Sequence, residues 1–233
     1  RYFYGDTLYA FTAVGTEHDL PIYLRTAEAR RHDSITTIFA LQEIRELLPE
    51  LTIRDAIFDS AMDNYPTYKL CSNWGIHPFI ALNDRTKNED GAGLPRGVTC
   101  LDDYGRPVCP GGIPYAYWGS MEGKGLKFRC WFAAHSSYGR TIYIKPESDP
   151  RLFPPVARQS ETFREKLRQR SGAERVNKRI FVDYGVEKGH MRDRKQRFFR
   201  ATMASVNIHL DVWIKHSSVQ WFDILTGACL DAA

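Results

Sequence analysis

The pattern of apolar and polar positions at the start of the chain predicts a strand hairpin followed by a helix. Residues 2–13 are rich in Tyr, Phe and Thr, residues 15–19 read as a turn, and residues 20–25 return as a second strand. From residue 34 to residue 48 the apolar positions take on helical spacing, and Asp33 and Ser34 are the candidate caps of that helix.

Two further strands are predicted on either side of a second helix. Residues 51–58 form an apolar strand that ends at Asp59, a helix begins near Pro66 and runs to Trp74, and residues 76–82 form another strand. We expect Asp63 to cap this helix and Asp55 to be an ordinary strand residue. The order of elements predicts an α/β fold with a mixed sheet flanked by helices.

The middle of the chain has a different composition from the two ends. Gly, Pro, Asp and Asn are frequent in residues 84–150, with short aromatic strands predicted at 115–118, 127–132 and 140–144. Residues 160–184 and 196–216 are then predicted to be helical. We therefore expect three parts: residues 1–83 as the first part of an α/β core, 84–150 as a β-rich insertion, and 151–233 as a helical part of the core.

Charge along the chain is more informative than its total. The net charge is only +4, yet residues 164–200 hold 13 Lys or Arg against 5 Asp or Glu, a local excess of +8. A basic block in a mildly acidic body favours a polyanionic partner such as nucleic acid, although a solvated helix face is the simpler explanation. Five irregularly spaced cysteines argue for a reducing compartment, and no apolar run approaches the ~18 residues that span a bilayer.

Two acids stand out as candidate ligands of a metal ion. Asp59 follows an apolar strand directly, where a carboxylate is close to solvent yet rigidly held, as Mg²⁺ coordination requires; a turn or capping role is the alternative. Glu174 lies four residues from both Arg170 and Lys178 on a basic helix. That spacing fits a ladder of salt bridges worth ~0.5 kcal/mol per pair, or equally a metal ligand flanked by cations that bind phosphates.

The predicted insertion contains four residues that could bind zinc, namely Cys100, Cys109, Cys130 and His135. Their spacing is irregular and includes no Cys-x-x-Cys pair, so buried thiols are the better interpretation. The aromatic residues at 115–118 could stack on bases, but packing within the insertion is favoured.

Three segments resemble DDE-type transposases of bacterial insertion sequences, and the resemblance runs over nearly the whole chain. They are residues 58–65 (FDSAMDNY), 137–141 (SYGRT) and 171–176 (SGAERV), and the segment 206–211 (VNIHLD) also fits. The resemblance implies a ribonuclease-H-like catalytic core, often with a β-rich insertion before the last acid. It also implies three acids that bind two divalent ions, Mg²⁺ or Mn²⁺, for cleavage and transfer of DNA strands.

Within this resemblance Asp59 corresponds to the second acid and Glu174 to the third. Met62 replaces the aromatic residue expected after Asp59, and Leu167 and Phe181 replace the Tyr and Lys that flank Glu174 in the family motif Tyr-x-x-Arg-x-x-x-Glu-x-x-x-x-x-x-Lys. These departures concern contacts with DNA more than the metal ligands. The residues expected to bind DNA are Arg170, Arg175, Lys178 and Arg179.

The first acid is the gap in this assignment. Asp6 is a candidate, but only one strand separates it from the first helix where the core pattern expects two, so we expect the first strand upstream of Arg1 and the chain to be a fragment. An inactive DNA-binding remnant and a metal-dependent nuclease on the same core remain alternatives. The resemblance further implies double-stranded DNA partners (transposon ends and target), a homodimer on synapsed ends, no membrane association, and a bacterial cytoplasmic location near the nucleoid.

Overall fold

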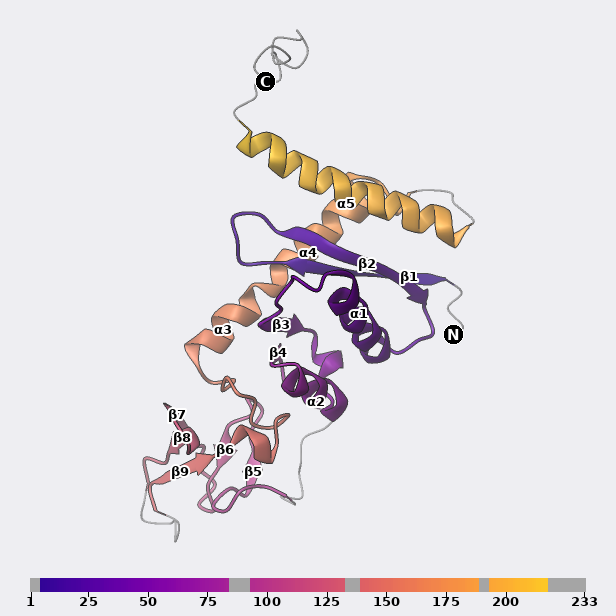
Figure 1. Cartoon of the computed structure of the whole chain (residues 1–233). Helices are drawn as coiled ribbons and strands as arrows, with labels where there is room; N and C mark the ends of the chain where they lie inside the picture. Colours follow the sequence, from indigo (N-terminus) through magenta and orange to yellow (C-terminus); the bar gives the residue numbers. More distant parts are fainter. Residues whose placement is uncertain (1–4, 84–92, 133–138, 189–192, 218–233) are drawn as a thin grey trace. The chain divides into compact units, whose positions relative to one another are not determined.

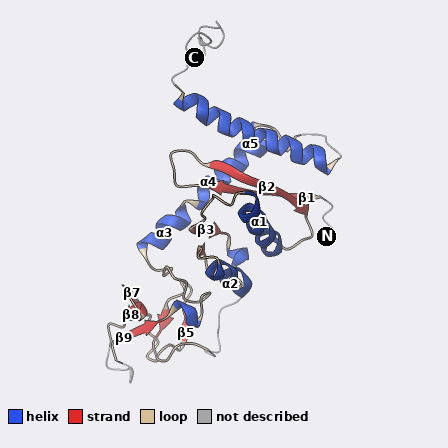
Figure 2. Ribbon diagram, in the orientation of Figure 1, coloured by secondary structure: helices blue, strands red, loops and turns tan. Residues whose placement is uncertain are grey.

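The protein is a mixed α/β molecule, shown as a computed structural model that describes residues 5–83, 93–132, 139–188 and 193–217 (Figure 1). Helices and strands both recur along the chain (Figure 2), and the strands of these residues form four small sheets. The chain divides into two compact units, Arg1–Arg31 with Ser171–Ala233, and His32–Arg170.

The first unit combines a strand hairpin with helices from the other end of the sequence. Strand β1 (Asp6–Ala13) pairs with β2 (Leu20–Glu28) in antiparallel register, which confirms the predicted hairpin. The helices are α4 (Arg170–Lys178), a wider helical turn η5 (Arg179–Asp183) and α5 (Arg194–His216). Its core consists of buried residues from the helices and partly buried leucines of the hairpin: Val176, Ile180, Ala201, Ala204 and Ile208, with Leu8, Leu20 and Leu24.

Close packing in this unit depends on Gly172 in α4. A Cβ at this position would lie 2.5 Å from Oδ1 of Asp19 and 2.7 Å from Cγ1 of Val14, closer than side chains tolerate. Glycine here therefore permits the helix to approach the turn that joins β1 to β2, at the cost in helix propensity that glycine normally carries.

The second unit begins with a parallel pair of strands joined by a helix. Helix α1 (Asp33–Leu47) is followed by β3 (Asp55–Phe58), a short 3₁₀ helix η1 (Ser60–Met62), α2 (Tyr65–Asn73) and β4 (His77–Ile80). Strands β3 and β4 are parallel, from Asp55 opposite His77 to Phe58 opposite Ile80. Two small clusters pack around them, one of Ala56, Cys71 and Ile76 and one of Met62, Tyr68 and Ile80, and the side chain of Phe58 packs on both.

A β-rich region completes the second unit. Strands β5 (Cys100–Leu101) and β6 (Pro107–Val108) form one ribbon; β7 (Ala116–Met121), β8 (Gly125–Arg129) and β9 (Thr141–Ile144) form an antiparallel sheet, followed by η4 (Pro146–Ser148) and α3 (Glu161–Arg168). The three short strands predicted in this region are thus present, with ends shifted by up to three residues. Tyr115 is fully buried in the cluster beneath this sheet and Tyr117 packs against it, whereas Trp118 is exposed.

The helix boundaries differ from the sequence predictions in several places. Neither Asp33 nor Ser34 caps α1: the cap is His32, whose ring nitrogen Nδ1 accepts a hydrogen bond from the backbone N–H of Ser34 at 3.4 Å. An imidazole nitrogen supplies the same acceptor as the expected oxygen. The helical segment predicted at 160–184 begins at Glu161 and is interrupted at Gln169, which ends α3 before α4 begins.

Candidate functional site

Asp59 lies at the carboxyl end of β3, where the chain leaves the parallel pair. It caps the N-terminus of η1, because its Oδ1 accepts hydrogen bonds from the backbone N–H of Ser60 (2.6 Å) and from the Ser60 hydroxyl (3.2 Å). Its Oδ2 is 3.6 Å from Nη1 of Arg170, and its side chain is 68% exposed. The predicted metal ligand is therefore oriented by its own turn, and its side chain is largely exposed.

Asp63 has a different role from the helix cap that the sequence predicted. The N-cap of α2 is Asn64, whose Oδ1 accepts a hydrogen bond from the backbone N–H of Thr67 at 3.1 Å. The Asp63 side chain is fully buried and forms an ion pair with Arg151, whose Nη2 is 2.8 Å from Oδ2 of Asp63. The prediction was wrong because the pattern of local caps cannot reveal a partner 88 residues away in sequence.

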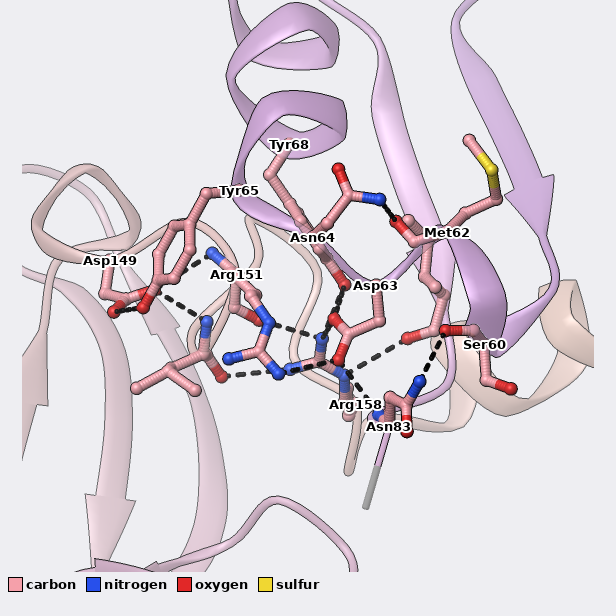
Figure 3. Close-up of polar contacts among 12 residues, drawn as sticks. Ser60, Met62, Asp63, Asn64, Tyr65, Tyr68, Asn83, Asp149, Arg151 and Arg158 are labelled. Carbon is pink, nitrogen blue, oxygen red and sulfur yellow. Dashed lines mark hydrogen bonds and ion pairs between the residues drawn. The ribbon is translucent and has the colours of Figure 1, made fainter. Parts of the chain in front are cut away.

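Around Asp63 lies a network of buried polar groups (Figure 3). Its carboxylate accepts hydrogen bonds from the Tyr68 hydroxyl (3.1 Å) and the backbone N–H of Asn83 (2.9 Å), and Nη2 of Arg158 is 3.7 Å from it. Burial alone would lower the pKa of the Arg151 guanidinium, but the hydrogen bond and charge of Asp63 raise it. Burial raises the pKa of Tyr68, so its hydroxyl remains a donor.

Asp55 takes part in an ion pair that the sequence did not predict. Its Oδ2 is 2.8 Å from Nζ of Lys166 in α3, and its Oδ1 is 3.3 Å from Nδ1 of His77 on the paired strand. Burial would raise the pKa of Asp55, but the hydrogen bond and charge of Lys166, together with the hydrogen bond from His77, lower it overall. Asp55 thus joins α3 to the β3–β4 pair and is more than an ordinary strand residue.

Glu174 lies on the exposed side of α4, in the first unit of the chain. The same helix contributes Val176, which is fully buried, to the core of this unit. Asp59 belongs to the second unit, so the predicted convergence of Asp59 and Glu174 on one cleft stays a prediction.

Two of the four residues predicted to bind DNA form ion pairs within the first unit. Arg175 contacts Asp19 through two nitrogens, Nε at 2.8 Å and Nη2 at 2.7 Å from Oδ2. Arg179 contacts Oδ2 of Asp211 at 2.7 Å, and the hydroxyl of Tyr184 donates to the same oxygen at 2.6 Å. Lys178 is exposed, and Arg170, in the second unit, is the residue near Asp59.

Asp6, the candidate first acid, opens strand β1 beside two arginines of α5. Its Oδ1 lies 3.4 Å from Nε of Arg194, and its Oδ2 contacts Nη2 of Arg197. These ion pairs account for Asp6 without a metal ion, and its assignment as the first acid stays a prediction.

The candidate zinc ligands are only partly described by the structure. The sulfur atoms of Cys109 and Cys130 lie 3.8 Å apart, and His135 lies outside the described residues. Among the residues that the structure describes, one group of three ligand-type side chains has its ligand atoms within 4.8 Å of one another, and it consists of Glu17, His18 and His216. That group lies in the first unit, and His18 Nε2 and His216 Nε2 are 2.7 Å apart.

A cavity of about 640 Å³ lies beside α2 and is distinct from the Asp59 turn. Tyr65, Pro66 and Lys69 line one side, and the segment from Pro146 to Pro150 lines the other. The predicted chemistry is therefore on an open turn at the end of a strand, and not inside this cavity.

The sequence interpretation missed Asp63, Arg151 and Arg158 as partners. The sequence did contain a signal for buried arginines. Arg151 and Arg158 flank the largely apolar segment 152–157, and a charged side chain that is buried with such a segment needs a partner. The acid that both arginines contact could not be identified from spacing, because Asp63 precedes the β-rich region in the sequence and the two arginines follow it.

Comparison with known protein families gives one match that covers most of the chain. Residues 4–208 match the family described as "Transposase DDE domain". No curated protein and no solved structure shows a significant match to the chain. No helix among the described residues is long and apolar enough to cross a bilayer. Because the match covers most of the sequence, the chain belongs to the transposase DDE domain family.

Proposed function

We propose that this chain is the catalytic domain of a DNA transposase, on a ribonuclease-H-like core, and that Asp59 and Glu174 are two of its metal-binding acids. The observation that carries the proposal is the placement of Asp59. It is an exposed carboxylate at the carboxyl end of a parallel strand, in a chain of a transposase family. In open α/β sheets, ligands bind beyond the carboxyl ends of parallel strands.

The Asp59 carboxylate has the chemistry that a divalent ion requires. Its Oδ1 is oriented by the N–H of Ser60, and its Oδ2 has Arg170 at 3.6 Å, longer than a direct hydrogen bond. Mg²⁺ and Mn²⁺ bind through one or two such carboxylates and keep several waters. When bound, divalent ions would supply activation of the attacking hydroxyl and stabilisation of the leaving oxygen.

We further propose that the basic block binds the phosphates of double-stranded DNA through Arg170, Arg175, Lys178 and Arg179. Arg175 and Arg179 already pair with Asp19 and Asp211, so their contacts with DNA would compete with these carboxylates. Phosphate contacts of this kind release counterions, which makes binding strongly dependent on salt. We also propose that two copies pair on synapsed ends, as the family resemblance implies.

Strand cleavage and strand transfer by the full-length enzyme carrying Asp59→Asn or Glu174→Gln test the proposal. Each substitution removes a metal ligand with little change of shape, so both reactions should collapse while DNA binding persists or tightens from the lost negative charge. Glu161→Gln is the matched control, because Glu161 is an exposed helix glutamate with ion pairs of 3.3 Å to Arg164 and Arg168. Near-normal strand transfer by Glu174→Gln would remove this residue from the active site.

The same assay separates the alternatives. Cleavage without any strand-transfer product would identify a nuclease on the same core. DNA binding without metal binding or cleavage would identify an inactive remnant. Transposition predicts both cleaved and joined products, each dependent on Mg²⁺ or Mn²⁺.

A further inference from the structure

We propose that Asp63 is a positioning residue for Asp59. The buried cluster of Asp63, Arg151 and Arg158 fixes the η1 turn and thereby holds the Asp59 carboxylate at the carboxyl end of β3. This proposal rests on the proposed function, in which Asp59 binds the metal ion. It assigns a role to three buried charged side chains that touch no reacting group.

The two aspartates lie at opposite ends of one short turn. Asp59 is the N-cap of η1 and Asp63 is its C-cap, and two backbone bonds link them to the turn: Met62 N to Asp59 O at 2.9 Å, and Asp63 N to Ser60 O at 3.1 Å. A 3₁₀ turn of this length has poor hydrogen-bond geometry and little stability of its own. Its conformation, and with it the direction of Asp59, therefore depends on what holds Asp63.

Asp63 is held by groups from three separate segments (Figure 3). Arg151 comes from the chain after β9, Tyr68 from α2, and Asn83 from the chain after β4. The side chain of Asn83 also donates to the carbonyl of Ser60 at 3.4 Å. The turn that follows β3 is thus tied to the segment that follows β4, so the carboxyl ends of both parallel strands are fixed together.

The arginines are themselves held in place by further hydrogen bonds. Arg158 donates to the carbonyls of Ile80 (3.2 Å), Leu152 (3.0 Å) and Arg151 (2.8 Å), and to the hydroxyl of Tyr68 (2.6 Å). The Arg151 guanidinium lies 5.5 Å from the centre of the Tyr65 ring. Because Ile80 ends β4, the cluster is anchored to the same pair of strands whose end it organises.

Burial distinguishes the roles of the two carboxylates. The side chain of Asp63 is 0% exposed and that of Arg151 is 4% exposed, while that of Asp59 is 68% exposed. An acid with both oxygens engaged by buried donors is poorly suited to bind an ion directly. A buried ion pair is also a weak source of stability compared with apolar packing of similar volume. We therefore infer that Asp63 serves to fix the geometry of the turn.

Two measurements on the folded protein test this role: hydrogen exchange of the Ser60 amide, which donates to Asp59, and Mn²⁺ affinity by electron paramagnetic resonance. The variants are Asp63→Asn and the milder Tyr68→Phe. The control is Ile144→Val, which removes one buried methyl group from the β-rich cluster of the same unit. All proteins are compared at temperatures where their folded fractions are equal, so that loss of stability alone cannot produce a difference.

Asp63→Asn should speed exchange at Ser60 and weaken Mn²⁺ binding by about 10-fold, as loss of a residue that orients a metal ligand commonly does. Tyr68→Phe should change the Ser60 exchange rate and the Mn²⁺ affinity in the same directions by a smaller factor. If Asp63→Asn does not fold, Tyr68→Phe alone tests the positioning role. Ile144→Val should change neither by more than about 2-fold. Mn²⁺ affinity that requires Asp59 but is unchanged in both variants would overturn the positioning role alone. Mn²⁺ binding that survives Asp59→Asn would overturn the proposed function.

Discussion

The two proposed metal-binding acids are supported by different kinds of interaction. Asp59 is carried by a turn that a buried, charged network holds in place, while Glu174 is carried by a helix that apolar residues and exposed ion pairs hold in place. Removing one charge from the buried network leaves another charge without water or partner. The ion pair on the helix is more open to solvent, because the Arg175 side chain is 63% exposed, although that of its partner Asp19 is 14% exposed. The two acids should therefore differ in how strongly their geometry depends on electrostatics.

The largest expected effect is that of removing Arg151. Arg151→Met leaves the fully buried Asp63 without its closest cation, and breaking such a pair costs about 3–5 kcal/mol. The equivalent change in the other unit, Arg175→Met, removes a pair whose arginine is 63% exposed and should cost about 1 kcal/mol or less. Urea unfolding of both variants measures the difference. Equal losses of unfolding free energy would show that the buried Asp63–Arg151 pair contributes no more to stability than a surface ion pair.

A smaller effect is expected where α4 packs closely within the first unit. Alanine normally stabilises a helix relative to glycine by roughly 0.5–1 kcal/mol. Gly172→Ala should instead destabilise the protein by about 1–3 kcal/mol, because the new methyl group would collide with Asp19 and Val14. Asn177→Ala, at an exposed position of the same helix, serves as the control in thermal unfolding. A more stable Gly172→Ala protein would mean that the helix does not approach the hairpin turn so closely.

The ion pair of Asp55 should make stability depend on acid pH. The pKa of Asp55 is lowered below its ordinary value of 3.8 in the folded protein, mainly by Lys166 against the opposing effect of burial. A depressed pKa contributes stability that is fully present above the unfolded value and is lost as pH falls through the folded one. The stability advantage of the natural protein over Lys166→Met should be constant near neutral pH and should shrink below about pH 4. An advantage that is unchanged at pH 3 would contradict this assignment.

The smallest effect on stability, with a distinct effect on DNA binding, is expected for Arg170 in the second unit. If Arg170 contacts a phosphate, Arg170→Ala should weaken binding to all sequences alike and lower the slope of log affinity against log salt by about 1. Lys178→Ala, from the first unit, should do the same. If these residues serve only in a helix ladder with Glu174, each change should cost a few tenths of a kcal/mol and leave DNA affinity unchanged.

Local patterns predicted most of the secondary structure. The hairpin, the helix α1, the β3–α2–β4 unit and the final helix all follow from apolar spacing, because each element buries one face of its own. The same pattern predicted a carboxylate directly after an apolar strand, and Asp59 lies there, while its role as a metal ligand stays a prediction. Family resemblance then added Glu174, which spacing alone could not separate from a salt-bridge ladder.

Contacts between distant segments could not be predicted in this way. Asp63 looks like a helix cap in its local sequence, and only the fold brings Arg151 and Arg158 to it. His32 was missed as a cap because imidazole is an uncommon acceptor at that position. Arg175 and Arg179 look like free cations within a basic block, but Asp19 and Asp211 approach them from other parts of the chain.

Cleavage of the polypeptide by bound iron tests the central claim, that Asp59 and Glu174 bind the same metal centre, most directly. Fe²⁺ in place of Mg²⁺, with ascorbate and peroxide, produces hydroxyl radicals that cut the backbone close to the ion. The account predicts cuts near residue 59 and near residue 174, both suppressed by excess Mg²⁺ and both lost in Asp59→Asn. Cuts near residue 59 without any near residue 174, or cuts confined to the group of Glu17, His18 and His216, would contradict it.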